Sequence, residues 1–152
     1  MKKCPVLYLL HGYGGNAGTW LGIKPELPRI ADKEGIIFVC PDGKNSWYWD
    51  SPENPAYRYE TFVTSELVKY TDGNYATIPD RKARAISGLS MGGHGALWSA
   101  IRHKDVFGAA GSMSGGVDIR PFPQNWEMSK QLGEFAANKA SWDAHTVVNQ
   151  FG

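Results

Sequence analysis

Cysteine is scarce in this sequence. The chain of 152 residues has two, Cys4 and Cys40, and their spacing excludes a zinc site built from cysteines. Cys4 lies at the start of one expected strand and Cys40 near the end of the next, so their sulfur atoms would be too far apart for a disulfide. We expect two free thiols.

An excess of charge and long apolar runs are also absent. Sixteen basic residues balance fifteen acidic ones, which leaves a net charge of +1 and no electrostatic case for binding nucleic acid or a membrane surface. No apolar run approaches the roughly 20 residues that span a bilayer. Residues 1–3 lead directly into a core strand rather than a signal peptide. We expect one soluble domain over residues 1–152 that begins inside the fold, which leaves cytoplasmic and exported locations open.

Apolar runs of strand length alternate with helix-like segments along the chain. Strands are expected at residues 5–10, 36–40, 83–86 and 106–112, and helices at 20–34, 60–70 and 91–104, followed by a helical tail. This alternation predicts an α/β fold of three layers, in which a parallel sheet has helices on both faces. The expected strand order is second, first, third, fourth. Bare sheet edges pair readily, so we expect the chain to dimerise, aggregate or associate through them.

The most informative stretch is Ser-Gly-Leu-Ser-Met-Gly-Gly-His-Gly at 87–95, which contains Gly-x-Ser-x-Gly around Ser90. Between a strand and a helix, such a serine occupies a tight turn above the carboxyl edge of the sheet. Gly88 and Gly92 let this turn close. The Met91 amide and the helix N-terminus would then face a developing oxyanion. The motif alone also occurs in turns that have no catalytic role. Its position between a strand and a helix, however, predicts that Ser90 is an acyl-transfer nucleophile.

Two loops at the carboxyl ends of the first two strands could complete a site. The glycine-rich loop 11–15 can aim a second amide at the oxyanion, and we assign this donor to Tyr13, with Gly14 as the neighbouring alternative. In the aromatic-rich loop 44–59, the rings either line a pocket or tether the loop, and Trp47 is the best candidate for the pocket. The other expected pocket residues are His11, Gly12 and Gly14. Because His11 lies beside the oxyanion loop, we expect it to act as a structural hydrogen-bonding residue rather than as a base.

Together these motifs resemble the putative-esterase branch of the α/β-hydrolases, which includes S-formylglutathione hydrolase (esterase D), feruloyl and acetyl-xylan esterases, tributyrin esterases and mycolyltransferases. The resemblance covers nearly the whole chain. Its most specific part is Gly-Leu-Ser-Met-Gly-Gly at 88–93 with the upstream His-Gly loop at 11–12. It implies a partial α/β-hydrolase fold, with Ser90 as nucleophile and the Tyr13 and Met91 amides as the oxyanion hole.

Members of that branch are longer, and their catalytic Asp and His follow the nucleophile late in the chain. The sequence therefore resembles the middle of an esterase with both ends missing. Among its own residues, we expect His94 to point away from Ser90 and His103 to be exposed. His145 and Asp118 remain as less favoured base and acid candidates. Without a general base a serine is a poor nucleophile, so we expect this chain alone to be nearly inactive.

The leading interpretation is a serine carboxylic-ester hydrolase that works through an acyl-enzyme on Ser90, without metal or cofactor. Its partner would be a small-molecule ester of an acetyl, short-chain or feruloyl group, including carbohydrate-linked esters. The alternatives are an acyltransferase using the same site and a catalytically incomplete fragment that only binds its ligand.

Overall fold

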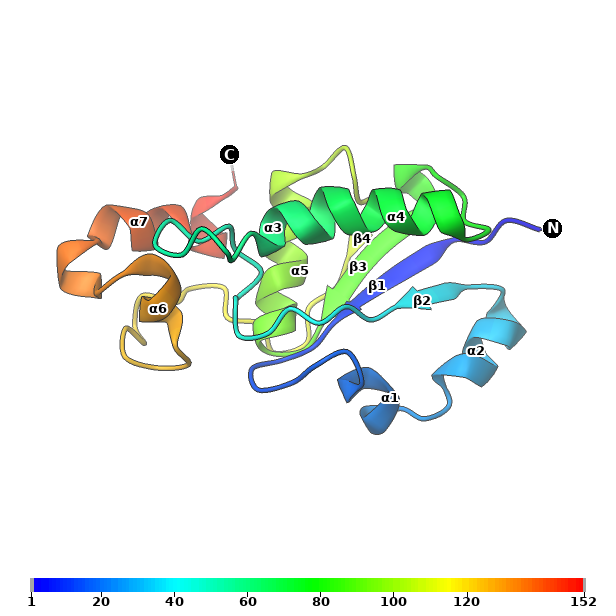
Figure 1. Ribbon diagram of the computed structural model, residues 1–152, viewed down its shortest axis with the longest axis horizontal. Coiled ribbons are helices and arrows are strands. Elements are labelled where there is room, and N and C mark those ends of the chain that lie inside the picture. The colour runs from blue at the N-terminus through cyan, green and yellow to red at the C-terminus, as the bar shows by residue number, and fades with distance from the viewer. Residues whose placement is uncertain (1, 152) are drawn as a thin grey trace.

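A four-stranded parallel sheet lies at the centre of the computed structural model, which describes residues 2–151 (Figure 1). Its strands are β1 (Val6–Leu10), β2 (Ile37–Val39), β3 (Arg84–Gly88) and β4 (Ala109–Ala110). Their order, β2-β1-β3-β4, is the predicted one. In the β1–β3 register Leu10 pairs with Gly88, so β1 and β3 end at the same level. The loop after β1 and the turn after β3 therefore leave the sheet side by side.

The two faces of the sheet are covered by different helices, as the alternation of β1 side chains requires. Tyr8 and Leu10 point into the larger core, shared with α5 (Met91–Arg102). The helix over residues 59–74 also contributes to this core. Leu9 points to the smaller core with α1 (Thr19–Ile23) and α2 (Leu27–Glu34). Figure 1 shows α1 and α2 on the side of the sheet opposite α3 (Tyr59–Thr61) and α4 (Leu67–Asn74). The predicted three-layer α/β architecture is confirmed.

Several element boundaries differ from those expected. The helix predicted at 20–34 is two helices, α1 and α2, separated at 24–26, where Pro25 prevents a continuous helix. The helix predicted at 60–70 instead runs over α3 (Tyr59–Thr61), a π-helical segment (Phe62–Glu66) and α4 (Leu67–Asn74). The strand predicted at 106–112 is reduced to β4, whose two alanines are exposed. A 3₁₀ turn (Arg81–Ala83) precedes β3.

The helical tail folds back onto the larger core. It contains α6 (Met128–Leu132) and α7 (Lys139–Ala144), with 3₁₀ turns at Phe135–Ala137 and Val147–Asn149. Met128, Leu132, Trp142 and Val147 are fully buried in that core. In Figure 1, α6 and α7 lie beyond the carboxyl ends of the strands, so the segment leading to α6 closes over this end of the sheet.

Both cysteines lie outside the strands β1 and β2. Cys4 and Cys40 are both free, as predicted from their positions at the start of the first expected strand and near the end of the second. Within residues 2–151, no helix has the length and apolar character needed to cross a membrane. The edges of the described sheet are β2 and β4, the strands expected to be available for association.

Candidate active site

Ser90 occupies a strained turn between β3 and α5. Its backbone has φ 57° and ψ −115°, a conformation that non-glycine residues rarely adopt. Two backbone hydrogen bonds hold the turn: the Ser90 N–H donates to the Met113 carbonyl at 2.8 Å, and the Ser90 carbonyl accepts from the His94 N–H at 3.0 Å. The Ser90 side chain is exposed. The fold therefore maintains a backbone strain that presents this hydroxyl at the carboxyl edge of the sheet.

Glycine is required on both sides of this turn because the backbones approach closely. A Cβ atom on Gly88 would collide with the Gly92 backbone, and one on Gly92 would collide with the Leu10 carbonyl. The two glycines of the Gly-x-Ser-x-Gly motif thus allow α5 to pack directly against the ends of β1 and β3.

The loop after β1 lies against the serine turn. A Cβ on Gly12 would be 3.4 Å from the Ser90 Cβ, so these two segments are in contact. Among the described residues, neither the Tyr13 N–H nor the Met91 N–H has a hydrogen-bond acceptor. The Gly14 N–H, the alternative second donor, is already occupied because it donates to Asn45 Oδ1 at 2.8 Å. This pattern favours Tyr13 over Gly14 as the second donor.

A cavity of about 220 Å³ opens beside Ser90. Tyr13, Ser90 and Trp47 line it together. The remaining lining residues come from one segment that the sequence did not single out: Ser114, Gly116, Asp118, Ile119, Phe122, Trp126 and Met128. Trp47 lines the cavity and also connects its own loop to the segment that contains Trp126, because its Nε1–H donates a hydrogen bond to the Trp126 carbonyl at 3.0 Å.

His11, Gly12 and Gly14, which the sequence places in a substrate pocket, do not line this cavity. His11 is fully buried. Its Nε2 accepts a hydrogen bond from the Gly43 N–H at 2.9 Å, which requires Nδ1 to carry the proton that it donates to the Gly12 carbonyl at 2.7 Å. His11 therefore has a structural role: it connects the loop after β1 to the loop after β2. Gly12 contacts the serine turn, and Gly14 lines a different cavity.

None of the four histidines, all within the described residues, lines the Ser90 cavity. His94 is fully buried with its Nδ1 3.0 Å from the Gly116 carbonyl, and burial lowers its pKa to about 4. His145 stacks on Trp98 with a centroid distance of 5.6 Å, and burial also lowers its pKa. His103 was expected to be exposed but is half-buried, with its Nε2 2.7 Å from Glu60 Oε2.

The acid candidate Asp118 does line the cavity. Its carboxylate accepts hydrogen bonds from the Arg120 guanidinium at 2.8 and 2.9 Å, and this pairing lowers its pKa. An ionised Asp118 without a neighbouring histidine cannot orient an imidazole base for Ser90 in the way a triad carboxylate does.

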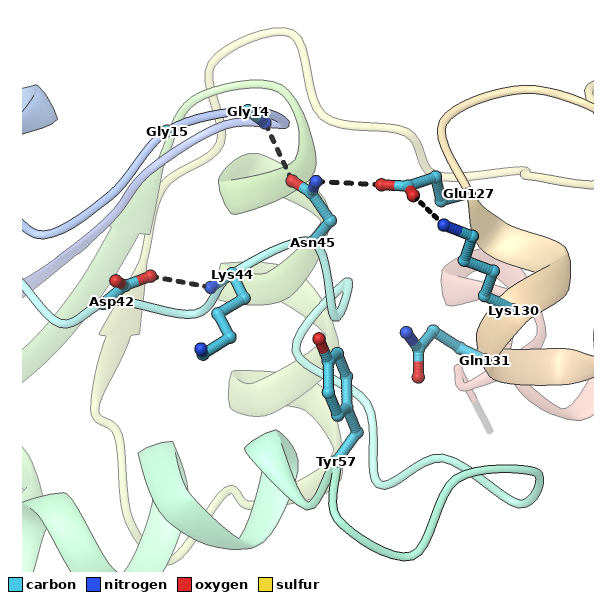
Figure 2. Close-up of a pocket in the computed structure, with 9 residues that line it drawn as sticks. All are labelled: Gly14, Gly15, Asp42, Lys44, Asn45, Tyr57, Glu127, Lys130 and Gln131. Atoms are coloured by element: carbon cyan, nitrogen blue, oxygen red, sulfur yellow. Dashed lines mark hydrogen bonds and ion pairs between the residues drawn. The ribbon is translucent and has the colours of Figure 1, made fainter.

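A second, more polar cavity of about 350 Å³ lies next to the glycine-rich loop (Figure 2). Its lining residues come from the loops after β1 and β2 and from the start of the tail: Gly14, Gly15, Asp42, Lys44, Asn45, Tyr57, Glu127, Lys130 and Gln131. Figure 2 shows Asn45 between Gly14 and Glu127 on one side of this cavity. Tyr13 and Trp126, which directly precede Gly14 and Glu127 in the sequence, line the Ser90 cavity. These two pairs of residues therefore form a wall that the two cavities share.

Comparison with known proteins relates this geometry to an established family. A family model described as "Putative esterase" matches residues 1–150. The acetyl esterase of Caldicellulosiruptor saccharolyticus is 33% identical over 106 residues, which cover 70% of this chain and 39% of the relative. The diacylglycerol acyltransferase/mycolyltransferase Ag85A of Mycobacterium leprae is 40% identical over 124 residues, 75% of this chain and 37% of the relative.

A solved structure has the same fold over nearly the whole chain. The fluorophosphonate-binding serine hydrolase FphF of Staphylococcus aureus matches with a TM-score of 0.86 at 20% identity, over 99% of this chain and 58% of its own. The chain thus spans well under two thirds of the length of each of these three proteins.

Proposed function

The chain belongs to the family described as putative esterase and has part of an α/β-hydrolase fold, and from this premise we propose that it carries the nucleophile and oxyanion hole of a serine carboxylic-ester hydrolase. One observation supports this most: the strained Ser90 turn lies against the loop whose Tyr13 N–H has no acceptor, and the Met91 N–H beside it has none either. Amides without acceptors next to an exposed hydroxyl are what a tetrahedral oxyanion requires.

The proposed reaction has two acyl-transfer steps. The Ser90 Oγ attacks the ester carbonyl carbon, and the carbonyl oxygen becomes an oxyanion that accepts hydrogen bonds from the Tyr13 and Met91 amides. The C–O bond to the alcohol then breaks, the alcohol leaves with a proton, and an acyl-Ser90 remains. Water attacks this ester in the same way and releases the acid. The base that takes the Ser90 proton would be a histidine supplied from outside this chain, because the four histidines present lie elsewhere.

The lining of the Ser90 cavity supports a small or aromatic acyl group as substrate. Ile119, Phe122, Trp126 and Met128 form an apolar surface around about 220 Å³. Such a surface fits an acetyl or short-chain acyl group or the ring of a feruloyl ester, the classes that the family resemblance implies.

Acyl transfer to an alcohol is the second candidate reaction. The polar cavity behind the shared wall could hold a hydroxylated acceptor in place of water, and one relative is named as a mycolyltransferase. Adding glycerol or glucose to an ester assay separates the two reactions: a hydrolase releases only free acid, whereas a transferase forms a new ester.

A fluorophosphonate probe tests the assignment of the nucleophile. Peptide mapping by mass spectrometry should find the phosphonyl group on Ser90, attached slowly because this chain places no base beside the hydroxyl. The Ser90→Ala variant should stay unlabelled, whereas Ser114→Ala, which removes another hydroxyl of the same cavity, should keep the label. A label on Ser114 instead, or no label on either serine after prolonged incubation, would contradict the proposal and favour a module that only binds its ligand.

A further inference from the structure

The carboxylate of Glu127 connects three segments of the chain around the wall between the two cavities. It accepts a hydrogen bond from the Tyr13 hydroxyl at 3.1 Å and another from Asn45 Nδ2 at 2.9 Å, and it forms an ion pair with Lys130. Asn45 in turn accepts a hydrogen bond from the Gly14 N–H through its Oδ1. Figure 2 shows this chain of contacts from Gly14 through Asn45 to Glu127 and Lys130. Glu127 therefore holds the glycine-rich loop at two points, the Tyr13 side chain and the Gly14 amide.

The backbone around Glu127 is itself in an unusual conformation. Trp126 and Glu127 are consecutive non-glycine residues with positive φ, 51° and 56°. Trp47, which also has a positive φ of 57°, donates its indole N–H to the Trp126 carbonyl. Left-handed residues in succession persist only where surrounding contacts hold them. From this turn the Glu127 carboxylate contacts both Tyr13 in the loop and Lys130 in α6.

Glu127 is ionised in this arrangement. Its pKa is lowered by the hydrogen bond from Lys130 and then by those from Tyr13 and Asn45. An ionised carboxylate has enough lone pairs to accept all three donors at once, whereas a neutral amide in its place would offer one acceptor oxygen. Hydrogen bonds to an ionised acceptor are also stronger than those between neutral groups.

We propose that Glu127 is a positioning residue for the oxyanion loop: through Tyr13 and Asn45 it fixes the loop so that the Tyr13 amide faces the space above Ser90. The catalytic part of this inference depends on the proposed function, whereas the structural part, that Glu127 orders residues 13–14, does not. Removing one oxyanion donor typically costs about a hundred- to a thousandfold in rate, so a loop that is only loosened should cost about tenfold.

The structural part can be measured without any reaction. Amide hydrogen exchange followed by ¹⁵N NMR should show that Glu127→Gln raises the exchange rate of the Gly14 amide about tenfold. Glu134→Gln removes the same charge from an exposed position in the same segment, and should leave the Gly14 rate unchanged. Asn45→Ala should act like Glu127→Gln, and the double variant should add little, because both act through one chain of hydrogen bonds. Unchanged Gly14 exchange in Glu127→Gln would overturn the proposal.

The catalytic part is measured by the kinetics of Ser90 phosphonylation. In Glu127→Gln we expect the maximal labelling rate to fall about tenfold while the half-saturating probe concentration stays within about twofold, because the loop acts on the oxyanion and not on probe binding. Complete final labelling would show that the variant is folded. If Glu127→Gln raised the exchange rate of the Gly14 amide but left the maximal labelling rate of Ser90 unchanged, only the catalytic part would be refuted. A native protein that never labels would refute the proposed function, and the Gly14 exchange would still decide whether Glu127 orders the loop.

Discussion

Ester hydrolysis by this chain on its own is expected to be slow, with a contribution from Ser90 of no more than about tenfold. With the oxyanion hole but no base, a serine hydrolase keeps only about 10³- to 10⁴-fold acceleration over water, whereas complete enzymes typically exceed about 10⁶-fold. The reason lies in the placement of the histidines. His94 is behind Trp47 at a centroid distance of 5.3 Å, and His145 is stacked against Trp98. Neither reaches the cavity that contains Ser90.

Hydrolysis of p-nitrophenyl acetate, corrected for the spontaneous reaction, measures this effect. Ser90→Ala should lower the rate of the isolated chain by no more than about tenfold, because an unactivated hydroxyl contributes little. His145→Gln is the matched control for a concealed base, and should change nothing. Rapid turnover that disappears in both Ser90→Ala and His145→Gln would show that His145 reaches the serine and that the base lies within this chain.

Acid is expected to destabilise the protein through His94. Its pKa is about 4 in the folded chain against 6.5 as the ordinary value, because the ring is fully buried. The His94 ring therefore binds a proton more tightly in the unfolded chain than in the folded one. The stability that depends on neutral His94 is complete above about pH 6.5 and is lost as the pH falls toward 4, an effect on the order of 3 kcal/mol. Burial acts on His145 in the same direction.

Urea unfolding of native protein and His94→Gln between pH 7 and pH 4 isolates this contribution. At pH 7 the variant should be less stable, since the contact with the Gly116 carbonyl is altered. Toward pH 4 its deficit should shrink by about 3 kcal/mol, because the variant has no buried ring to protonate. His103→Gln, at the end of the same helix and half-buried, should keep the acid sensitivity of the native protein. Native and His94→Gln stabilities that fall in parallel would contradict this account.

The parts of the site that the sequence predicted depend on local backbone constraints. Gly88, Ser90 and Gly92 are neighbours in the sequence, and the turn they form needs glycines at those positions whatever the rest of the fold does. The strand order also followed from sequence, since short crossovers between parallel strands leave few arrangements.

The parts that were not predicted depend on long-range packing. Phe122 and Trp126 lie in a proline-broken stretch without periodicity, so nothing local showed that they would face Ser90 across the sheet edge. The positive φ of Glu127 and its contact with Tyr13, 114 positions away, likewise have no local signal. The direction of the His11 ring also has no local signal: it is buried, and its Nε2 accepts a hydrogen bond from the Gly43 amide, 32 positions away. A position at the carboxyl edge of a sheet is thus a guide to a site but does not determine side-chain direction.

The most direct test of the central claim is a crystal structure of the protein after reaction with a fluorophosphonate. We expect the phosphorus to be bonded to Ser90 Oγ and one phosphoryl oxygen to lie about 2.7–3.1 Å from both the Tyr13 and Met91 nitrogens, the geometry of an occupied oxyanion hole. An adduct on Ser90 whose phosphoryl oxygen contacts neither nitrogen, or an adduct on another residue, would contradict the account.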